Sequence, residues 1–533
     1  MGGPCLSCPR DSDAMPDGTA PASSEAGEAE PCRVRDRGSV DNEWVTVAVA
    51  LVGAAVVLAG WALKVAALGI IPGNRKPSTG MAWLLVILLS PLIGLVAFLF
   101  FGRTALGRRH HERQRIANER IAARTQDLPV LPDDLGLPPY VASVVHLNRR
   151  LGSLPLLPGN DVQVIDDYKG SIAEMTEAVG SAKAYVNVEF YITAWDDVTA
   201  PLFEALVAAT QRGVTVRLLF DHLGSKGIPG HPDMLARLAA TDIQWHAMLP
   251  LHLRPGKSFR RPDLRNHRKL LVVDGNVGFT GSQNLVEPGY NKPKNHAAGR
   301  EWVELMVRLR GPVVAALEAV FYSDWFTETD EELTVAAVRA PDEAPDGALR
   351  EVPGQLVPSG PGFVAENNLR MFTTLIYGAT RRISLTSPYF VPDESLLYAV
   401  TTAAQRGVDV ELFVSEESDQ FMVGHAQASY YRALLEAGVR IYLYPAPSVL
   451  HSKHFTIDDD VAVIGSSNMD LRSFALNYEI SLMLLGTPVV TRMRAVEDTY
   501  RSLSHELTLE EWDRRPGRLK YVDNVMRLTS ALQ

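Results

Sequence analysis

The longest uninterrupted runs of hydrophobic residues lie near the start of the chain, at 44–63 and 81–101. Each is close to the roughly 20 residues that an α-helix needs to cross a bilayer. A signal peptide does not fit the first run, because a long acidic tail precedes it and a second run follows it. A hairpin buried in a soluble core is the alternative, and the uninterrupted length argues against it. The pattern therefore predicts two transmembrane helices, with Pro91 able to kink the second without breaking it.

Beyond these runs, strand-like and helix-like patterns alternate, and the same order occurs twice. Strands are predicted at 185–192 and 383–390. Segments 208–220 and 402–414 then share a helix end, a glycine turn and a strand of alternating polar and apolar residues. Each half continues through a longer segment into two further short strands. Strands that alternate with helices predict an α/β fold in which helices cover the sheet.

The last two strands of each half carry the same polar residues at the same spacing. In "HRKLLVVDGNVGFTGSQN", which starts at His267, lysine, aspartate, glycine and asparagine follow at offsets of 2, 7, 14 and 17. "HSKHFTIDDDVAVIGSSN", which starts at His451, has the same offsets. On a half-buried strand the histidine and lysine share one face, where the lysine can attract an anion and the imidazole can attack or protonate it. Two packed halves would bring both motifs to one phosphate.

This twin motif, H-x-K-x4-D followed by G-S-x-N, resembles the phospholipase D superfamily. From about residue 44 onward the chain is similar to bacterial cardiolipin synthases. The similar segments are "NRKPSTGMAW", "GREWVELMVRLRGPVVAALEAVFYSDW" (299–325) and "MDLRSFALNYEISLML" (469–484), whereas the extreme C-terminus matches only loosely. The resemblance implies two phospholipase D-like sandwich repeats, each with a central mixed β-sheet flanked by helices, and no metal or other cofactor.

The predicted organisation has five parts. A disordered tail at 1–43, rich in Gly, Ala, Ser, Pro and acidic residues, precedes two transmembrane helices at 44–102. A basic juxtamembrane linker follows at 103–155. Phospholipase D-like domains are predicted at 156–345 and 346–533.

Positively charged residues flank the two apolar runs unevenly. The loop between the runs carries Arg75 and Lys76, with Lys64 at its edge. The flanking segments carry Arg33, Arg35 and Arg37 before the first run and Arg103, Arg108, Arg109, Arg113, Arg115, Arg120 and Arg124 after the second. The positive-inside rule then predicts a cell-membrane protein with both the tail and the catalytic domains in the cytoplasm.

The resemblance implies a role for each polar residue of the motifs. The implied catalytic residues are His267, Lys269, Asp274, His451, Lys453 and Asp458. The implied phosphate ligands are Ser282, Asn284, Ser466 and Asn468, and the implied supporting acids are Glu301 and Glu479. The resemblance puts the nucleophile at His267 and the acid and base at His451, a choice that the residues alone leave open.

Two of these assignments have a structural alternative. For Glu301 the alternative is that it is an ordinary surface glutamate on an edge strand. This alternative is serious because Glu304 lies close by in the sequence. Asp274 and Asp458 sit at strand ends just before turns, where fixing the loop explains them at least as well as catalysis.

Composition and charge add little to this picture. A chain of 533 residues with 46% hydrophobic and 21% charged residues allows two or three globular units. The net charge of −10 does not suggest an anionic partner, but a cluster of basic residues runs into the first motif. Its members are Arg254, Lys257, Arg260, Arg261, Arg265, Arg268 and Lys269. The cluster would attract phosphate headgroups or nucleic acid equally well, and a solvated basic loop is the alternative.

Cysteine and metal chemistry play no expected part. Cys5, Cys8 and Cys32 all lie in the tail, which excludes a disulfide framework in the catalytic part. His451 and His454 have no neighbouring acid or cysteine in the sequence that would make them metal ligands.

A cardiolipin synthase would move a phosphatidyl group from one phosphatidylglycerol to another through a phosphohistidine, releasing glycerol. The expected partners are phosphatidylglycerol and anionic membrane lipids, with no nucleic acid. The alternatives are a membrane-anchored phospholipase D or other transphosphatidylase, a nuclease, and a membrane scaffold with an inactive site. The sequence leaves the acceptor lipid and the oligomeric state open.

Overall fold

The computed structural model describes residues 38–73, 77–102, 108–132, 135–152, 154–251, 261–333, 347–364 and 366–530. It divides into two compact units, residues 1–92 and 93–533. The predicted tail as far as residue 37, with its cysteines, lies outside the described residues. So do Arg254, Lys257 and Arg260 of the basic cluster.

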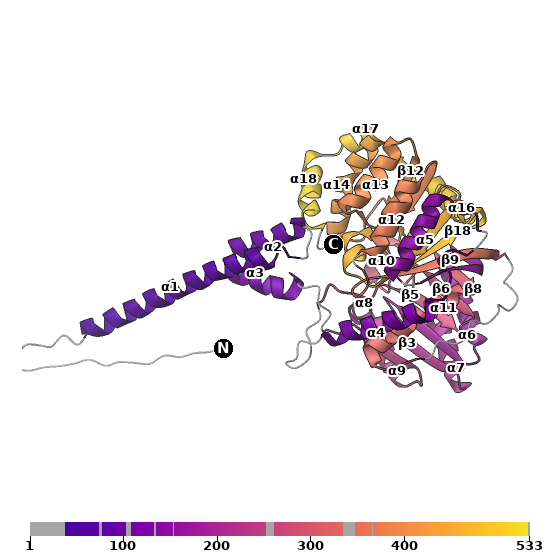
Figure 1. The fold of residues 1–533 in the computed structure, drawn as a ribbon, viewed down its shortest axis with the longest axis horizontal. Coiled ribbons are helices and arrows are strands. Elements are labelled where there is room, and N and C mark those ends of the chain that lie inside the picture. Colours follow the sequence, from indigo (N-terminus) through magenta and orange to yellow (C-terminus); the bar gives the residue numbers. More distant parts are fainter. Residues whose placement is uncertain are drawn as a thin grey trace, which may run out of the picture. The chain divides into compact units, whose positions relative to one another are not determined.

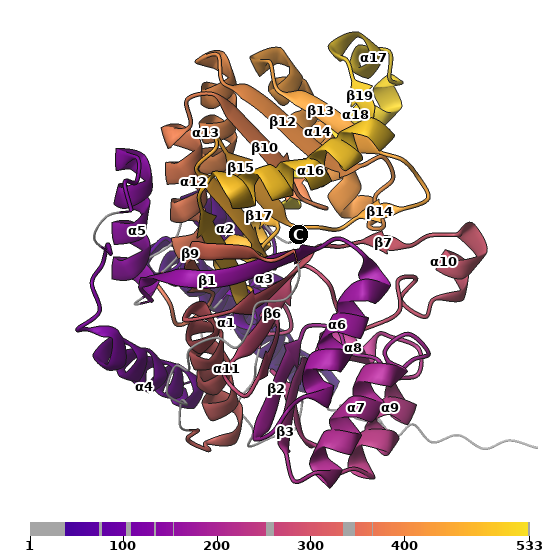
Figure 2. The same cartoon turned by 90° about the vertical axis from the view of Figure 1, so that its right-hand side faces the viewer.

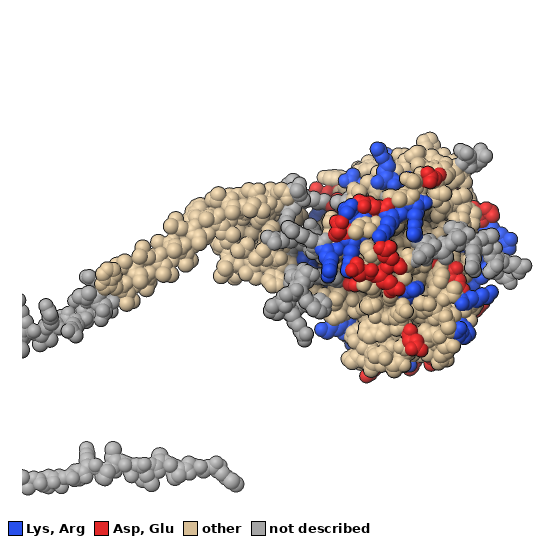
Figure 3. Space-filling model, turned by 60° about the horizontal axis from the view of Figure 1, so that its bottom comes forward, with Lys and Arg blue, Asp and Glu red and all other residues tan. Residues whose placement is uncertain are grey.

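The first unit contains a long apolar helix, α1 (Gly38–Ile70), and helix α2 (Pro77–Leu89). Within α1, the 27 residues Trp44–Ile70 are long and apolar enough to cross a membrane. The face of this helix visible in Figure 3 shows no charged side chains. These features agree with the first predicted span.

The second apolar run is not one helix. Helix α2 ends at Leu89, and a separate helix α3 (Pro91–Ala97) follows, continued by a π-helical turn η1 (Phe98–Gly102). The break falls at Ser90, because the Pro91 ring has no N–H to continue the hydrogen-bond ladder. The prediction that Pro91 kinks this helix without breaking it is therefore wrong.

The second unit is built on one continuous 15-stranded sheet, so the two predicted central sheets are joined. Its order from one edge is β19-β13-β12-β10-β15-β16-β18-β9, continued by β1-β8-β6-β5-β2-β3-β4. Apart from β19, the second half repeats the strand order of the first outward from the central antiparallel pair β1–β9. Figure 2 shows this central pair between the two halves. The structure confirms an α/β fold with a large mixed sheet.

The strand bounds are as follows. The first half contains β1 (Leu156–Ile165), β2 (Tyr185–Phe190), β3 (Thr215–Asp221), β4 (Gln244–Met248), β5 (Lys269–Val273), β6 (Val277–Gly281) and β8 (Met306–Arg310). The second half contains β9 (Leu349–Ser359), β10 (Arg382–Thr386), β12 (Asp409–Ser415), β13 (Arg440–Tyr444), β15 (His454–Ile457), β16 (Val461–Gly465), β18 (Glu479–Leu485) and β19 (His505–Leu507). Four short strands, β7 (Trp302–Val303), β11 (Phe390–Val391), β14 (Val449–Leu450) and β17 (Met469–Asp470), form two small sheets.

Helices cover both faces of the large sheet (Figures 1 and 2). One face packs against α11 (Val313–Thr329) and α16 (Thr487–Leu503). The other packs against α6 (Tyr168–Gly180), α7 (Ala200–Gln211) and α9 (His231–Ala239) in the first half. In the second half that layer contains α5 (Pro139–Gly152), α12 (Asn367–Gly378), α13 (Glu394–Gln405) and α14 (Phe421–Ala437). Other helices of this unit are α4 (Arg108–Thr125), α8 (His222–Lys226), α10 (Pro293–Ala298), α15 (Leu471–Ala475), α17 (Leu509–Asp513) and α18 (Gly517–Arg527).

Strand β5 of the first motif is apolar on both faces after Lys269, because helices cover both faces of the sheet. Leu270 and Val272 of β5 pack in the core on the α11 side, whereas Leu271 and Val273 pack in the core on the α6 side. This burial explains why β5 shows no polar alternation after Lys269. Strand β15 does alternate: His454 and Thr456 share one face, where both lie against the buried Glu497.

The segment predicted as a linker, 103–155, contributes two packed helices. Helix α5 packs its buried valines against the second-half core. Helix α4 (Arg108–Thr125) bonds to both halves: Gln114 donates to the Ser323 hydroxyl at 2.9 Å, and His110 Nε2 lies 3.0 Å from the Tyr478 hydroxyl. Residues 108–125 are thus packed as part of the second unit.

Candidate active site

Short backbone pairings between the two halves bring the motifs together. The His451 amide donates to the Val303 carbonyl at 2.8 Å, next to the parallel pairing of β14 with β7. The His267 amide donates to the Tyr478 carbonyl, also at 2.8 Å. Each histidine is therefore anchored to a segment of the other half. Both histidines lie just before their strands, since β5 begins at Lys269 and β15 at His454.

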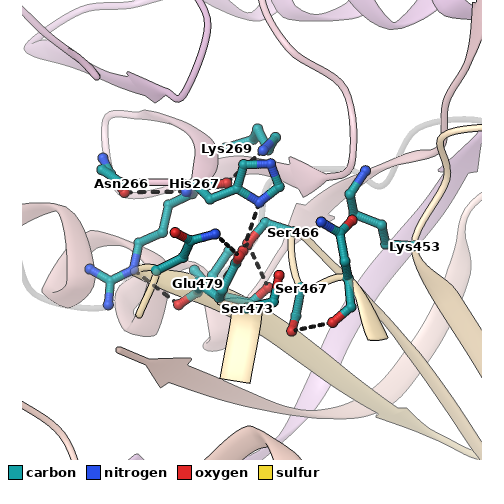
Figure 4. Close-up of polar contacts among 12 residues, drawn as sticks. Asn266, His267, Lys269, Lys453, Ser466, Ser467, Ser473 and Glu479 are labelled. Carbon is teal, nitrogen blue, oxygen red and sulfur yellow. Dashed lines mark hydrogen bonds and ion pairs between the residues drawn. The ribbon is translucent and has the colours of Figure 1, made fainter. Parts of the chain in front are cut away.

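Each imidazole is held by a carboxylate from the opposite half. His267 Nδ1 lies 3.0 Å from Glu479 Oε2, and His451 Nδ1 lies 2.5 Å from Glu304 Oε1. All four side chains are buried. Figure 4 shows His267 and Ser466 converging on Glu479. With Nδ1 bonded to a carboxylate, Nε2 of each ring is the nitrogen that can meet a substrate.

The prediction of Glu301 as a supporting acid is wrong, because the Glu301 side chain is exposed and Glu304 takes its place. The position of each acid relative to the motif serine explains why Glu304, and not Glu301, meets His451. Glu304 directly precedes Leu305, whose amide donates to the Ser282 hydroxyl, just as Glu479 directly precedes Ile480, whose amide donates to Ser466. Matching the apolar strands ELMV and EISL would have identified the equivalent acid.

The two motif lysines are buried beside the histidines. Lys453 Nζ lies 3.1 Å from His451 Nδ1 and 3.3 Å from Nε2, and each lysine donates to the carbonyl of its own motif histidine at 2.6 Å. Burial lowers the pKa of Lys453 to about 8. Burial, with Lys453 close by, also lowers the pKa of Lys269 well below its ordinary value. An anion between the two lysines would oppose these shifts, so the centre favours phosphate.

The histidines titrate as members of one centre. Burial, followed by the charges of Lys269, Lys453 and His451, lowers the pKa of His267 well below its ordinary value. Burial also lowers the pKa of His451, but there the charge of Glu304 opposes it. The charge of His451 thus contributes to the lowered pKa of His267, as expected for two rings that lie close together in a poorly solvated space. The neutral ring of His267 is suited to attack, and the carboxylate-supported ring of His451 to holding a proton.

The four predicted phosphate ligands differ in how many hydrogen bonds their side chains already make within the protein. The Ser282 and Ser466 hydroxyls accept backbone bonds from the neighbouring strands, at 3.0 Å each. The Asn284 amide donates to Tyr290 at 2.8 Å. Among the described residues, the buried Asn468 Oδ1 has no hydrogen-bond partner. Asn468 is thus the member of this set with the most unused hydrogen-bonding capacity.

Asp274 and Asp458 lie at the far ends of β5 and β15 from the histidines, so the structure does not place them in the centre. The Asp274 carboxylate accepts the amides of Lys183, Ala184 and Tyr185 at 2.7–2.8 Å. Asp458 accepts the amides of Thr380, Arg381 and Arg382 at 2.8–2.9 Å. Both have left-handed backbones, with φ of 52° and 48°. The geometry favours the loop-fixing alternative.

We expect Asp458→Asn to lower the free energy of unfolding by about 2 kcal/mol, because it removes a charged acceptor of several bonds. Burial alone would raise the pKa of Asp458, but the donated hydrogen bonds outweigh it and lower the pKa. Its stabilisation is therefore present above the unfolded-state pKa of about 4 and is lost as the pH falls through the folded value. Thermal unfolding of the purified protein followed by circular dichroism would measure it. The control is Asp459→Asn, a partly exposed residue that pairs with Arg381 and Arg494 and is expected to cost about 1 kcal/mol or less. Equal losses in the two variants would contradict the assignment.

Two tyrosines beside the histidines carry no motif signal in the sequence. The Tyr191 ring lies edge-on to His267 with ring centroids 4.9 Å apart. The Tyr389 ring lies edge-on to His451 at 6.2 Å, and its hydroxyl donates to Asp419 at 2.8 Å. Tyr191 directly follows β2, and Tyr389 lies between β10 and β11; β2 and β10 are the strands that pair with the motif strands β5 and β15. Their contacts limit how far each imidazole can turn.

The described part of the basic cluster is not a headgroup surface or a solvated loop. Arg261 pairs with Asp263, Arg265 with Asp221 and Arg268 with Asp324, and all three arginines are buried. Arg268 also donates to the Glu479 carbonyl at 3.1 Å, which fixes the strand that carries the acid. These arginines hold the first motif in place from inside the protein.

Comparisons with known proteins agree with this geometry. The family model described as "Cardiolipin synthase, PLD-like domain" matches residues 175–325 and 372–498. The model described as "Phospholipase_D-nuclease N-terminal" matches residues 57–103.

Similar proteins include three named cardiolipin synthase A. That of Proteus mirabilis (strain HI4320) is 32% identical over 458 residues, covering 83% of this chain and 90% of the relative. That of Klebsiella pneumoniae (strain 342) is 32% identical over 485 residues, covering 90% and 98%. That of Yersinia pestis bv. Antiqua (strain Angola) is 33% identical over 457 residues, covering 84% and 92%.

Among solved structures, the phosphatidylserine synthase of Haemophilus influenzae Rd KW20 is similar, with a TM-score of 0.52 and 12% sequence identity. The match covers 74% of this chain and 100% of that one. At this identity the similarity concerns the fold alone.

Proposed function

The chain belongs to the cardiolipin synthases of the phospholipase D superfamily, and from this premise we propose that it joins two phosphatidylglycerols into cardiolipin and glycerol. One observation carries the proposal: two imidazoles, each held at Nδ1 by a carboxylate of the opposite half, share a buried centre with two lysines. Such a centre suits two successive displacements at one phosphorus.

In the first displacement, His267 Nε2 attacks the phosphorus of the donor lipid. The N–P bond forms as the P–O bond to the glycerol headgroup breaks, and His451 gives its proton to the leaving alkoxide. Lys269 and Lys453 neutralise the charge that builds on the phosphate oxygens. The lowered pKa of His267 supports its assignment as nucleophile, since the ring is neutral before attack.

In the second displacement, the free glycerol hydroxyl of another phosphatidylglycerol attacks the phosphohistidine. His451 takes the hydroxyl proton, the O–P bond forms and the N–P bond breaks. The number of phosphodiester bonds does not change, so no nucleotide is consumed. Water must be kept from the intermediate, because its attack would give phosphatidic acid instead.

Both substrates are membrane lipids, which gives the apolar N-terminal part a role. We propose that α1 is one span and that α2, α3 and η1 together form the second. The arginines on either side of this pair put the catalytic unit in the cytoplasm. Tethering raises the effective concentration of lipid at the site.

Product analysis by the purified full-length protein tests this proposal. With phosphatidylglycerol vesicles we expect cardiolipin and glycerol in equal amounts. Phosphatidic acid as the main product would instead indicate a phospholipase D. Cleavage of DNA without lipid turnover would indicate a nuclease.

The assignment of Glu304, rather than Glu301, as the acid that supports His451 can be tested with a matched pair of variants. We expect Glu304→Gln to lower cardiolipin formation about tenfold to a hundredfold, because an amide cannot support the imidazolium of His451 in the same way. Glu301→Gln, three residues away and exposed, should stay within about twofold of the wild type. Initial rates on phosphatidylglycerol would compare them, and a larger loss for Glu301→Gln would reverse the assignment.

A further inference from the structure

The second displacement requires more positive charge than the first. The acceptor phosphatidylglycerol carries its own phosphodiester, only a glycerol unit away from the hydroxyl that attacks. While Lys269 and Lys453 neutralise the phosphate on His267, the acceptor brings a second anion close to the first. Two anions at short range in a buried site repel each other strongly. A further cation near His267 that is not already neutralised by the protein would therefore favour binding of the acceptor.

Most cations around the centre are already paired with acids. Arg265 pairs with Asp221 at 3.2 Å, and the fully buried Arg268 pairs with Asp324. On the other side, Arg300 pairs with Glu417 at 2.8 Å. These guanidinium groups have carboxylate partners and are poor candidates for a second phosphate.

Arg472 differs from these arginines in having no carboxylate partner among the described residues. It lies on α15, four residues after Asn468 of the second motif, and is half-buried. Within the described ranges it takes part in no ion pair, and its side chain makes one hydrogen bond, from Nη2 to the Asp263 carbonyl at 3.1 Å. A guanidinium has five N–H donors, so most of its donors remain for a ligand.

The position of Arg472 is on the His267 side of the centre. Asp263, which it contacts, lies in the first-half segment that leads directly into His267. The charge of Arg472 also lowers the pKa of Tyr191, although burial dominates and raises it, and the Tyr191 ring lies 4.9 Å from that of His267. The phosphohistidine that receives the acceptor would form at the same place.

The arginine is also specific to one half. Four residues after Asn284, at the matching position of the first motif, the chain has Pro288. The twin motif therefore has a single cation of this kind, as expected where two chemically identical lipids must play different parts.

We propose that Arg472 binds the phosphodiester of the acceptor phosphatidylglycerol and so selects a phospholipid over a neutral alcohol as acceptor. The inference rests on the proposed transfer between two phosphatidylglycerols. It makes Arg472 a specificity-determining residue of the second displacement, because the first needs only the donor phosphate. The guanidinium fork suits the two free oxygens of a phosphodiester.

The test offers two acceptors at once. Full-length protein receives phosphatidylglycerol vesicles with radiolabelled free glycerol, which lacks a phosphate. Cardiolipin reports transfer to the phospholipid, and labelled phosphatidylglycerol reports transfer to glycerol. We expect Arg472→Gln to lower the ratio of cardiolipin to labelled phosphatidylglycerol about tenfold or more, the effect of losing a charged hydrogen-bonding partner. Arg472→Lys, which keeps the charge but not the fork, should fall between Gln and the wild type.

The matched control is Arg381→Gln. Arg381 is exposed, pairs with Asp459 and lies at the Asp458 end of β15, so its loss should leave the ratio unchanged. An unchanged ratio in Arg472→Gln, or equal losses of both products, would overturn the inference and leave Arg472 as a structural link to Asp263. Wild-type protein that forms labelled phosphatidylglycerol but no cardiolipin would instead contradict the proposed function.

Discussion

His267→Ala should lower cardiolipin formation by roughly four to six orders of magnitude, the effect of removing a covalent nucleophile. The Nε2 of this ring is the atom that receives the phosphatidyl group, and no other group held by Glu479 can replace it. Neither product, cardiolipin nor labelled phosphatidylglycerol, should form above background. Lipid product analysis beside the wild type measures this, with membrane insertion and thermal unfolding as checks on folding. Residual turnover near the wild-type rate would contradict the assigned role.

His451→Ala should lower cardiolipin formation by roughly 10²–10⁴-fold, because the glycerol alkoxide would leave without a proton. The two histidines can be distinguished by the leaving group. A phosphodiester with a nitrophenolate leaving group needs no proton donor, so with it His451→Ala should still release nitrophenolate in a burst. His267→Ala should give no burst with either substrate.

A burst in His267→Ala and none in His451→Ala would exchange the two roles. Equal loss of the burst in both variants would contradict the division of labour itself. The assignment of different roles to the two histidines rests on how their supporting acids are held. Glu479 accepts hydrogen bonds from His267, Ser466 and Asn477. Among the described residues, Glu304 Oε2 has no hydrogen-bond partner. The nucleophile is thus held by the more constrained acid.

Much of the catalytic architecture could be predicted from sequence because its signal is local and repeated. The offsets between His267 and Asn284, found again from His451, specify which strands carry the chemistry. The alternation of helices and strands likewise specifies the fold class. Each motif lies within one short segment, 267–284 or 451–468, and its repetition makes it recognisable.

What could not be predicted depends on contacts between distant segments. The choice of Glu304 over Glu301 depends on which side chain meets His451, 147 residues away from Glu304. The union of two sheets into one depends on the pairing of β1 with β9. The basic cluster looked like a surface because its partners, Asp221 and Asp324, lie far along the chain.

The most direct test of the central claim is to find where the phosphatidyl group is carried. Phosphatidylglycerol labelled at phosphorus is mixed with the protein, and the reaction is quenched at high pH, where a phosphohistidine survives. Peptide mapping then locates the label. The account predicts label on His267 in the wild type, and none on any residue of His267→Ala. Label on His451, or an actively turning-over protein without a labelled histidine, would contradict it.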